Sequence, residues 1–231
     1  MTENAPLVQY LYANITAPPP ADISTQDNDM QTINSLPNPP LAKLTADQVY
    51  IRQCRLAGDQ VDAHGGCFRT ADLPKLLQMV QGAPALIGHN RTATATARFF
   101  GGSIQQHNGH NYIVPKFYWP RKLSTAEDLR IQIDSALMNE ASIAFNFTQA
   151  TCSICEKDMR ECDHTPGEEY DGKICNYYYD GPTSVLEGSF VYRGAEPGTG
   201  FLTKVPPPPT QIIFDGKIYN LVLAKKEPAN V

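Results

Sequence analysis

Three side chains that together can perform nucleophilic catalysis lie far apart in this sequence. Ser142 belongs to the run NEASIAFNF at 139–147, in which apolar residues alternate with small or polar ones, a pattern that predicts a strand. His89 follows a glycine, and Glu187 lies in a second strand-like run, VLEGSFV at 185–191. A serine nucleophile needs a base within hydrogen-bond reach and a group that orients the base. Sequence order does not restrict that geometry, so the three form a candidate triad; the alternative is that they are ordinary strand and loop residues.

A second group of chemically capable residues is confined to one polar insertion. Its spacing is Cys-x2-Cys, then Cys-x-His, then a further cysteine, at Cys152, Cys155, Cys162, His164 and Cys175. A Cys-x2-Cys knuckle presents two thiolates, and a structural zinc site needs four thiolate or imidazole ligands in a tetrahedron. The sequence does not choose which four bind Zn²⁺, and a disulfide arrangement is the alternative. With four protein ligands the role would be structural, a staple for a segment too polar to fold on its own apolar content.

The remaining cysteines and histidines give weaker signals. Cys54 and Cys67 are predicted to be core residues. His64 lies in a glycine-marked bend and is interpreted as a packed or turn histidine rather than a catalytic one. His107 and His110 lie in the run QQHNGH. This run is predicted to be an exposed loop, a poorer candidate for metal binding than the cysteine-rich insertion.

Composition bounds the class of protein. The 231 residues are 42% hydrophobic and carry a formal net charge of −5, which allows one sizeable core and differs from the basic footprint of a nucleic-acid-binding protein. No apolar run approaches the ~20 residues that span a bilayer, and no secretory signal pattern is found at the N-terminus. We therefore expect no nucleic acid and no membrane as partner. We also expect a reducing compartment, where clustered cysteines bind metal more often than they form disulfides.

The chain divides into three predicted regions. Residues 1–45 are rich in Pro, Asn, Ser and Thr and are expected to form an arm that is either extended on a neighbouring subunit or disordered. Residues 46–205 carry many short strand patterns and two helical ones, and contain the insertion at 151–176. Residues 206–231 comprise a polyproline linker and, from an Asp-Gly turn signal, a hairpin. We predict the α+β class, as a compact, mostly antiparallel β-barrel with flanking helices, a zinc-bound insertion and an extended N-terminal arm.

Five blocks of the sequence resemble, in order, segments of the prohead maturation proteases of tailed bacteriophages, a serine protease family related in fold to the herpesvirus assembly proteases. The blocks are DAHGGCF at 62–68, PALIGHN at 84–90, FFG at 99–101, AEDL at 126–129 continuing to EASIAF at 140–145, and LEGSFV at 186–191 continuing to GAEPG at 194–198. The second block is similar to the family's catalytic-histidine block at His89, the fourth to its catalytic-serine strand at Ser142, and the last to its closing block at Glu187. Asn90 stands where the family usually has Asp, and Ala144 where it usually has Gly.

The resemblance implies a serine endopeptidase that cleaves scaffold and capsid proteins during head assembly, with Ser142 as nucleophile, His89 as base and Glu187 orienting the imidazole. It implies phage capsid and scaffold proteins as partners, and a homo-oligomer or an assembly with shell subunits. The expected location is the host cytoplasm during assembly, and the prohead or virion. The alternative is a virion structural protein, such as a capsid-decorating, vertex or minor head protein, that reuses the protease fold without turnover. The proline-rich arm and the lack of a long charged helical tail favour that alternative.

Overall fold

The structure is a computed structural model that describes residues 23–202, with side chains from residue 27, and the two strands β14 (Thr210–Phe214) and β15 (Lys217–Leu221). The chain forms two units, one of residues 24–203 and one of residues 1–23 with 204–231. In the second unit β14 and β15 pair in antiparallel fashion, at the place of the predicted hairpin. The polyproline linker, the Asp-Gly turn and residues 1–22 of the predicted arm lie outside the described residues.

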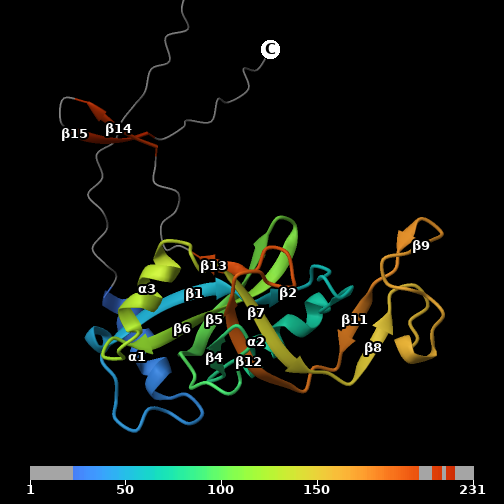
Figure 1. Ribbon diagram of the computed structural model, residues 1–231, viewed down its shortest axis with the longest axis horizontal. Coiled ribbons are helices and arrows are strands. Elements are labelled where there is room, and N and C mark those ends of the chain that lie inside the picture. The colour runs from blue at the N-terminus through green and yellow to red at the C-terminus, as the bar shows by residue number, and fades with distance from the viewer. Residues whose placement is uncertain (1–22, 203–209, 215–216, 222–231) are drawn as a thin grey trace, which may run out of the picture. The chain divides into compact units, whose positions relative to one another are not determined.

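One sheet forms most of the larger unit, and its strands follow the order β13–β1–β6–β5–β4–β12–β7, with β2 also paired to β6 (Figure 1). Neighbouring strands are antiparallel except β4 and β12, which run parallel. In chain order the strands are β1 (Val49–Arg55), β2 (Ala57–Gly58), β4 (Pro84–Ile87), β5 (Ala97–His107), β6 (His110–Pro120), β7 (Glu140–Asn146), β12 (Ser184–Val191) and β13 (Gly200–Leu202). The two strands predicted around Ser142 and Glu187 are therefore the neighbours β7 and β12.

The α+β class is confirmed, but no closed barrel is found among the described strands. β13 has three residues and pairs with β1, whereas β7 at the other end of the path pairs with β12. A backbone hydrogen bond from the N–H of Phe201 to the carbonyl of Asn139 (3.0 Å) links the two ends. The edges of the sheet therefore approach one another, but β13 is too short to form the ladder that would close a barrel.

Aromatic side chains fill the interior of this sheet. Phe99, Phe117, Trp119 and Phe190 are buried, and Phe117 stacks on Trp119 with ring centroids 5.8 Å apart. Each such ring removes on the order of 150–250 Å² from water, so these residues contribute much of the stability of the fold. Successive residues of a strand point to opposite faces, which places Phe190 and Glu187 on opposite sides of β12. The core therefore anchors β12 from one side and leaves Glu187 on the other.

Both helices predicted from the sequence are found, as α2 (Leu73–Met79) and α3 (Ala126–Asp134). Pro74 lies in the first turn of α2, where proline is tolerated. α3 buries Leu129 and Ile133, an i, i+4 pair on one face. Three short 3₁₀ helices are Ala46–Gln48, Thr70–Asp72 and Met159–Glu161. Across the part of the chain that the structure describes, no helix has the length and apolarity to cross a membrane.

Residues 23–34, predicted to belong to an extended or disordered arm, instead form helix α1 (Ile23–Asn34). One face of this segment packs against the main sheet. A small second cluster of buried residues contains Met30, Ile33 and Leu36 together with Val49, Phe100 and Tyr118. Lys116 of β6 also forms an ion pair with Asp29 of the helix, with an N···O distance of 2.5 Å. The three-residue spacing of the apolar side chains is a helical signal, which the polar composition of the segment obscures.

Two small sheets are formed by the cysteine-rich insertion together with the strands that flank it and with β3 (Gly66–Cys67). In one, β11 (Tyr177–Asp180) lies between β3 and β8 (Gln149–Cys152); in the other, β9 (Glu169–Tyr170) pairs with β10 (Lys173–Ile174). β3 runs parallel to β11, and β8 runs antiparallel to it. Because β3 belongs to the glycine-marked bend near residue 66, this pairing attaches the insertion to the chain that precedes α2.

Candidate functional site

His89 and Glu187 are in contact although 98 residues separate them in the sequence. His89 Nδ1 lies 2.6 Å from Glu187 Oε1, and the Glu187 side chain is 2% exposed whereas the His89 side chain is 40% exposed. A buried carboxylate that holds Nδ1 fixes the ring and leaves Nε2 available for proton transfer. The sheet produces this contact, because β4, which ends just before the histidine, pairs in parallel with β12.

The backbone at His89 has an uncommon conformation. Gly88 and His89 both have positive φ, 60° and 56°, and the N–H of Asn90 donates to the carbonyl of Ile87 at 3.2 Å. These are features of a type I′ turn, whose central positions favour glycine and asparagine. A non-glycine residue in the left-handed region costs roughly 1–2 kcal/mol, and such strain often occurs at functional sites. The turn reverses the chain after β4, so that the imidazole returns toward β12.

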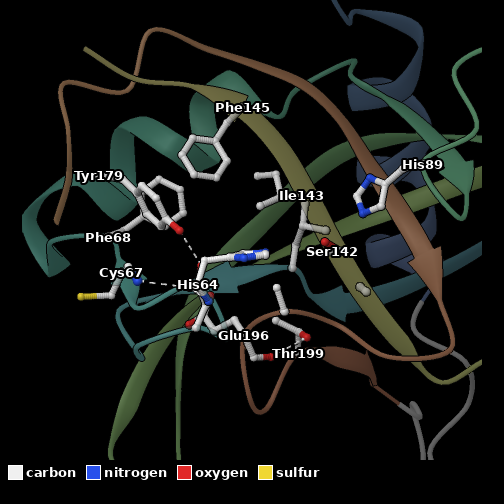
Figure 2. Close-up of a pocket in the computed structure, with 15 residues that line it drawn as sticks. His64, Cys67, Phe68, His89, Ser142, Ile143, Phe145, Tyr179, Glu196 and Thr199 are labelled. Carbon is white, nitrogen blue, oxygen red and sulfur yellow. Dashed lines mark hydrogen bonds between the residues drawn. The ribbon is translucent and has the colours of Figure 1, made fainter. Parts of the chain in front are cut away.

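Ser142 lies on β7, directly opposite Ser189 of β12. Opposed residues of an antiparallel pair share a face and have Cβ atoms roughly 4.5–5.5 Å apart, which places Ser142 one strand away from the contact between His89 and Glu187. Ser142 and His89 line the same cavity of ≈ 190 Å³ (Figure 2). In the described chain His89 hydrogen-bonds to Glu187 and Ser189 rather than to Ser142. Contacts of this kind are often loose before substrate binds.

The wall of this cavity contains ionisable groups to which the sequence assigns no role, namely Asp62, Tyr179 and Glu196. Tyr179 donates to Asp62 Oδ2 at 2.6 Å, and burial together with this hydrogen bond raises the pKa of Tyr179. Glu196 accepts the backbone N–H groups of Gly58 (2.7 Å) and Gln60 (3.2 Å). Burial nevertheless raises the pKa of Glu196 to about 8. The cavity therefore holds a carboxyl group that stays protonated well above the usual range of glutamate.

His64 also lines the cavity. It is interpreted from the sequence as a packed or turn histidine, and it lies in a turn with its side chain exposed rather than packed in the interior. Its N–H donates to Asp62 Oδ1 at 2.7 Å, and the turn is closed by the N–H of Gly65, which donates to the Asp62 carbonyl at 3.0 Å. In Figure 2, Ser142 lies between the imidazoles of His64 and His89.

A second, larger cavity of ≈ 720 Å³ opens beside the same serine and histidine. Its apolar lining residues include Ile87, Leu137 and Tyr192, and the last two are 77% and 89% exposed. Exposed apolar side chains gathered around one hollow are typical of a binding surface. Because Ser142 and His89 also line this cavity, it is suited to hold an apolar part of a substrate.

Four of the five candidate metal ligands come together. The donor atoms of Cys152, Cys155, Cys162 and His164 all lie within 4.8 Å of one another. The sulfurs of Cys155 and Cys162 are 3.4 Å apart, and His164 Nδ1 lies 3.3 Å from Cys162 Sγ and 3.7 Å from Cys152 Sγ. Tetrahedral ligation with Zn–S bonds of about 2.3 Å places sulfur atoms ~3.8 Å apart. The separations therefore suit a four-coordinate metal ion, and the prediction of a cluster that can hold a metal is confirmed for these residues.

Cys175 lies at the edge of this group. Its sulfur is 3.9 Å from that of Cys152, but it is not part of the set in which every donor lies near every other. The structure therefore favours the other four residues as the ligand set. None of the six cysteines, all of which lie among the described residues, forms a disulfide. Cys54 and Cys67 are buried, which confirms their prediction as core residues.

Backbone N–H groups point at two of the sulfurs. The N–H of Ile154 donates to Cys152 Sγ and that of His164 to Cys162 Sγ, both at 3.3 Å. Burial opposes the ionisation of Cys152, but the surrounding hydrogen bonds outweigh it and lower the pKa of this thiol to about 6. Burial raises the pKa of Cys162 to about 11. A bound cation would keep both groups as thiolates at neutral pH, as thiolate ligation of a metal requires.

His107 and His110 do not belong to the metal-capable group of the described residues. They face each other across the hairpin of β5 and β6. His107 Nε2 lies 3.2 Å from the side-chain amide of Asn108, and His110 Nδ1 lies 3.4 Å from Asp59 Oδ1. Each ring is therefore engaged with a separate polar partner.

The two candidate sites are joined by strand β11. Tyr179 of β11 lines the smaller cavity, and its ring centroid lies 5.3 Å from that of Phe68 and 4.9 Å from that of Phe145. The same strand pairs with β8, which carries Cys152. A Cβ atom on Gly66 of β3 would lie 2.4 Å from the Tyr179 ring, so this close approach requires glycine.

The chain matches no protein-family model, no curated protein and no solved structure. The functional argument therefore depends on the residues, contacts and cavities described above.

Proposed function

We propose that this chain is a serine endopeptidase with Ser142 as nucleophile, His89 as general base and Glu187 as the carboxylate that orients the base. The observation that carries the proposal is the 2.6 Å contact between His89 Nδ1 and the buried Glu187 Oε1, beside a cavity that Ser142 and His89 both line. A buried carboxylate, a half-exposed imidazole and a serine hydroxyl are the groups that acyl transfer requires.

In the proposed reaction Ser142 Oγ attacks the carbonyl carbon of the scissile peptide bond while His89 Nε2 takes the hydroxyl proton. Glu187 holds Nδ1, fixes the orientation of the ring and stabilises the imidazolium. The imidazolium then gives its proton to the leaving amine. A water molecule, deprotonated in turn by His89, releases the acyl group and regenerates Ser142.

The proposed substrates are extended segments of scaffold and capsid proteins in an assembling bacteriophage head, cleaved in the host cytoplasm or within the prohead. The sequence blocks around the candidate triad support this substrate class by resemblance. The larger cavity supports it physically, because ≈ 720 Å³ of apolar-lined space beside Ser142 can hold an apolar side chain of such a segment.

Co-expression with the capsid and scaffold proteins of the same virus tests this proposal, with intact mass as the readout. We expect specific cleavage products with the native chain and none with Ser142→Ala. Ser184→Ala is the matched control, because it removes a serine hydroxyl from the first residue of β12, which pairs with Asn146 and not with Ser142, and it should retain the products. Uncleaved partners with the native chain would contradict the protease proposal.

A second candidate function is a capsid-decorating, vertex or minor head protein that keeps the fold without turnover. One observation favours it: His89 hydrogen-bonds to Glu187 and Ser189 but not to Ser142 in the described chain. The same co-expression separates the two functions. Stoichiometric binding of the chain to assembled shells, with uncleaved partners, would indicate the structural protein.

We also propose that Cys152, Cys155, Cys162 and His164 bind one Zn²⁺ in a structural role. Support comes from the mutual proximity of the four donors and from their chemistry, since three sulfurs and one imidazole form a common structural zinc set. Metal analysis of the purified chain tests the proposal, and one equivalent of zinc is the expected result. A Cys175→Ser variant should keep the zinc, whereas Cys155→Ser should lose it. Purified protein without zinc and with oxidised cysteines would contradict the proposal.

A further inference from the structure

Ser189 contacts both the backbone of His89 and the carboxylate of Glu187. Its Oγ accepts the N–H of His89 at 3.0 Å and donates its O–H to Glu187 Oε2 at 2.7 Å. The other carboxylate oxygen, Oε1, lies 2.6 Å from His89 Nδ1. The three residues therefore form a closed ring of contacts, in which one hydroxyl ties the backbone of the histidine to the carboxylate that holds its side chain.

The environment of Ser189 excludes a role as nucleophile. The residue is 0% exposed, and its hydroxyl directs its proton to Glu187 while accepting from His89. Ser142, its partner across the strand pair, is partly exposed and lines both cavities. The two opposed serines lie on the same face of the sheet but therefore have different tasks: Ser142 borders the cavities, whereas Ser189 is covered and hydrogen-bonded on both sides.

The turn after β4 creates a need for this hydroxyl. The parallel ladder between β4 and β12 ends at the pair Ile87 and Phe190, and the N–H of Gly88 still donates to the carbonyl of Phe190 at 3.0 Å. The chain then leaves the ladder through two residues of positive φ. The N–H of His89 consequently has no strand carbonyl to bind, and the Ser189 hydroxyl accepts it instead.

Removing the hydroxyl would leave two polar groups without this partner. The partly buried N–H of His89 and the buried Glu187 Oε2 would both lose a hydrogen bond, which is costly. The carboxylate would be held through one oxygen only, and the left-handed conformation at His89 would lose the contact that stabilises it. The imidazole would then sample orientations away from Ser142.

We propose that Ser189 is a positioning residue, which holds His89 in its left-handed turn and locks the Glu187 carboxylate, so that the imidazole is presented to Ser142 in one orientation. The catalytic consequence rests on the proposed serine endopeptidase function. The positioning of His89 and Glu187 does not depend on that function, because their contact is present in the resting protein. Misplacement of a catalytic group by about 1 Å costs on the order of 10²-fold in rate.

The test compares Ser189→Ala with Ser184→Ala, a matched change on the same strand. Ser184 also accepts a hydrogen bond, from the Asn146 side-chain amide at 3.0 Å. The first readout is the NMR signal of the Nδ1-bound proton of His89 in protein with ¹⁵N-labelled histidine, assigned by its absence from His89→Gln. The second readout is kcat and KM for peptide cleavage. A third variant, Ser189→Thr, restores a hydroxyl at the same position.

We expect Ser189→Ala to lose the slowly exchanging Nδ1 proton signal and to lower kcat by about 10- to 100-fold with little change in KM. Ser189→Thr should recover much of both, and Ser184→Ala should match the native protein. Retention of the signal in folded Ser189→Ala would overturn the inference, whether or not the chain cleaves peptides. A native chain that shows the signal but no cleavage would contradict the endopeptidase proposal alone. If Ser189→Ala does not fold, Ser189→Cys gives the same comparison with a weaker hydrogen-bonding group of similar size.

Discussion

The candidate triad and the metal-capable group are built in opposite ways. The metal-capable group takes its four donors from one short segment, 152–164, so that local turns alone bring them together. The triad takes its residues from the strands β7 and β12 and from the turn after β4, and its two contacting members are 98 residues apart. The comparison teaches that spacing along the chain can specify a metal cluster, whereas a triad of this kind exists only after the sheet has assembled.

The largest expected effect is on the triad. Ser142→Ala should reduce peptide cleavage by about 10³-fold or more, because the nucleophile is lost. It should leave the free energy of unfolding almost unchanged, since the hydrogen bonds of His89 go to Glu187 and Ser189. Single-turnover cleavage and urea denaturation measure the two quantities. A variant that cleaves as fast as the native chain would remove Ser142 from the site.

Removal of metal should have the next largest effect, and it should be local. After a chelator is added, we expect the opening free energy measured by hydrogen exchange to fall by several kcal/mol for the backbone amides of 149–180, because the insertion depends on the metal for folding. Amides of β5 and β6 should keep their protection, since they belong to the main sheet. Uniform loss of protection in both regions would show that the two parts do not fold separately.

Glu196 should make the free energy of unfolding of the protein depend on pH. Burial raises its folded-state pKa to about 8, above the value of roughly 4.3 expected in the unfolded chain. Between these values the folded state binds more protons, so the free energy of unfolding should fall as pH rises, by at most about 1.4 kcal/mol per pH unit. Glu196→Gln should flatten this slope in denaturation measured at a series of pH values. Equal slopes in the two proteins would refute the raised pKa.

The smallest predicted effect concerns the link between the two regions. Tyr179→Phe removes the hydrogen bond from Tyr179 to Asp62 Oδ2 (2.6 Å) and should lower the free energy of unfolding by about 1 kcal/mol. Tyr177→Phe is the matched control, because the Tyr177 hydroxyl makes only a long 3.5 Å contact with that of Tyr179. The two midpoints of denaturation are compared at one pH. Equal losses of unfolding free energy in both variants would show that the contact with Asp62 stabilises the fold no more than the contact made by Tyr177.

Much of the sheet can be predicted from the sequence because its signals are local. The alternation of apolar residues around Ser142 and the strand-like run around Glu187 predicted the strands that became β7 and β12. Closure of the sheet into a barrel was predicted but is not found, because it depends on the length and pairing of β13. Helix α1 was not predicted, because its buried apolar residues Met30 and Ile33 are surrounded by many polar residues.

The difference between local signals and long-range pairing also applies to the two candidate sites. The spacing of the cysteines and His164 gave five candidate ligands for a four-ligand metal site, and only the structure shows that Cys175 stands outside the group of four. The contacts of Ser189 and of Tyr179 with Asp62 could not be predicted, because each joins segments whose proximity depends on strand register. Glu196 belongs to the sequence block GAEPG at 194–198, but its raised pKa depends on burial, which the sequence does not reveal.

The most direct test of the central claim is reaction of the purified chain with a fluorophosphonate, followed by mass spectrometry of its peptides. If His89 activates Ser142, the reagent should form one covalent adduct on Ser142. The adduct should be absent from Ser142→Ala and strongly reduced in His89→Gln, and Ser184→Ala should be labelled as the native chain is. No adduct on the native chain, or an adduct that persists in Ser142→Ala, would contradict the assignment of Ser142 as a catalytic nucleophile.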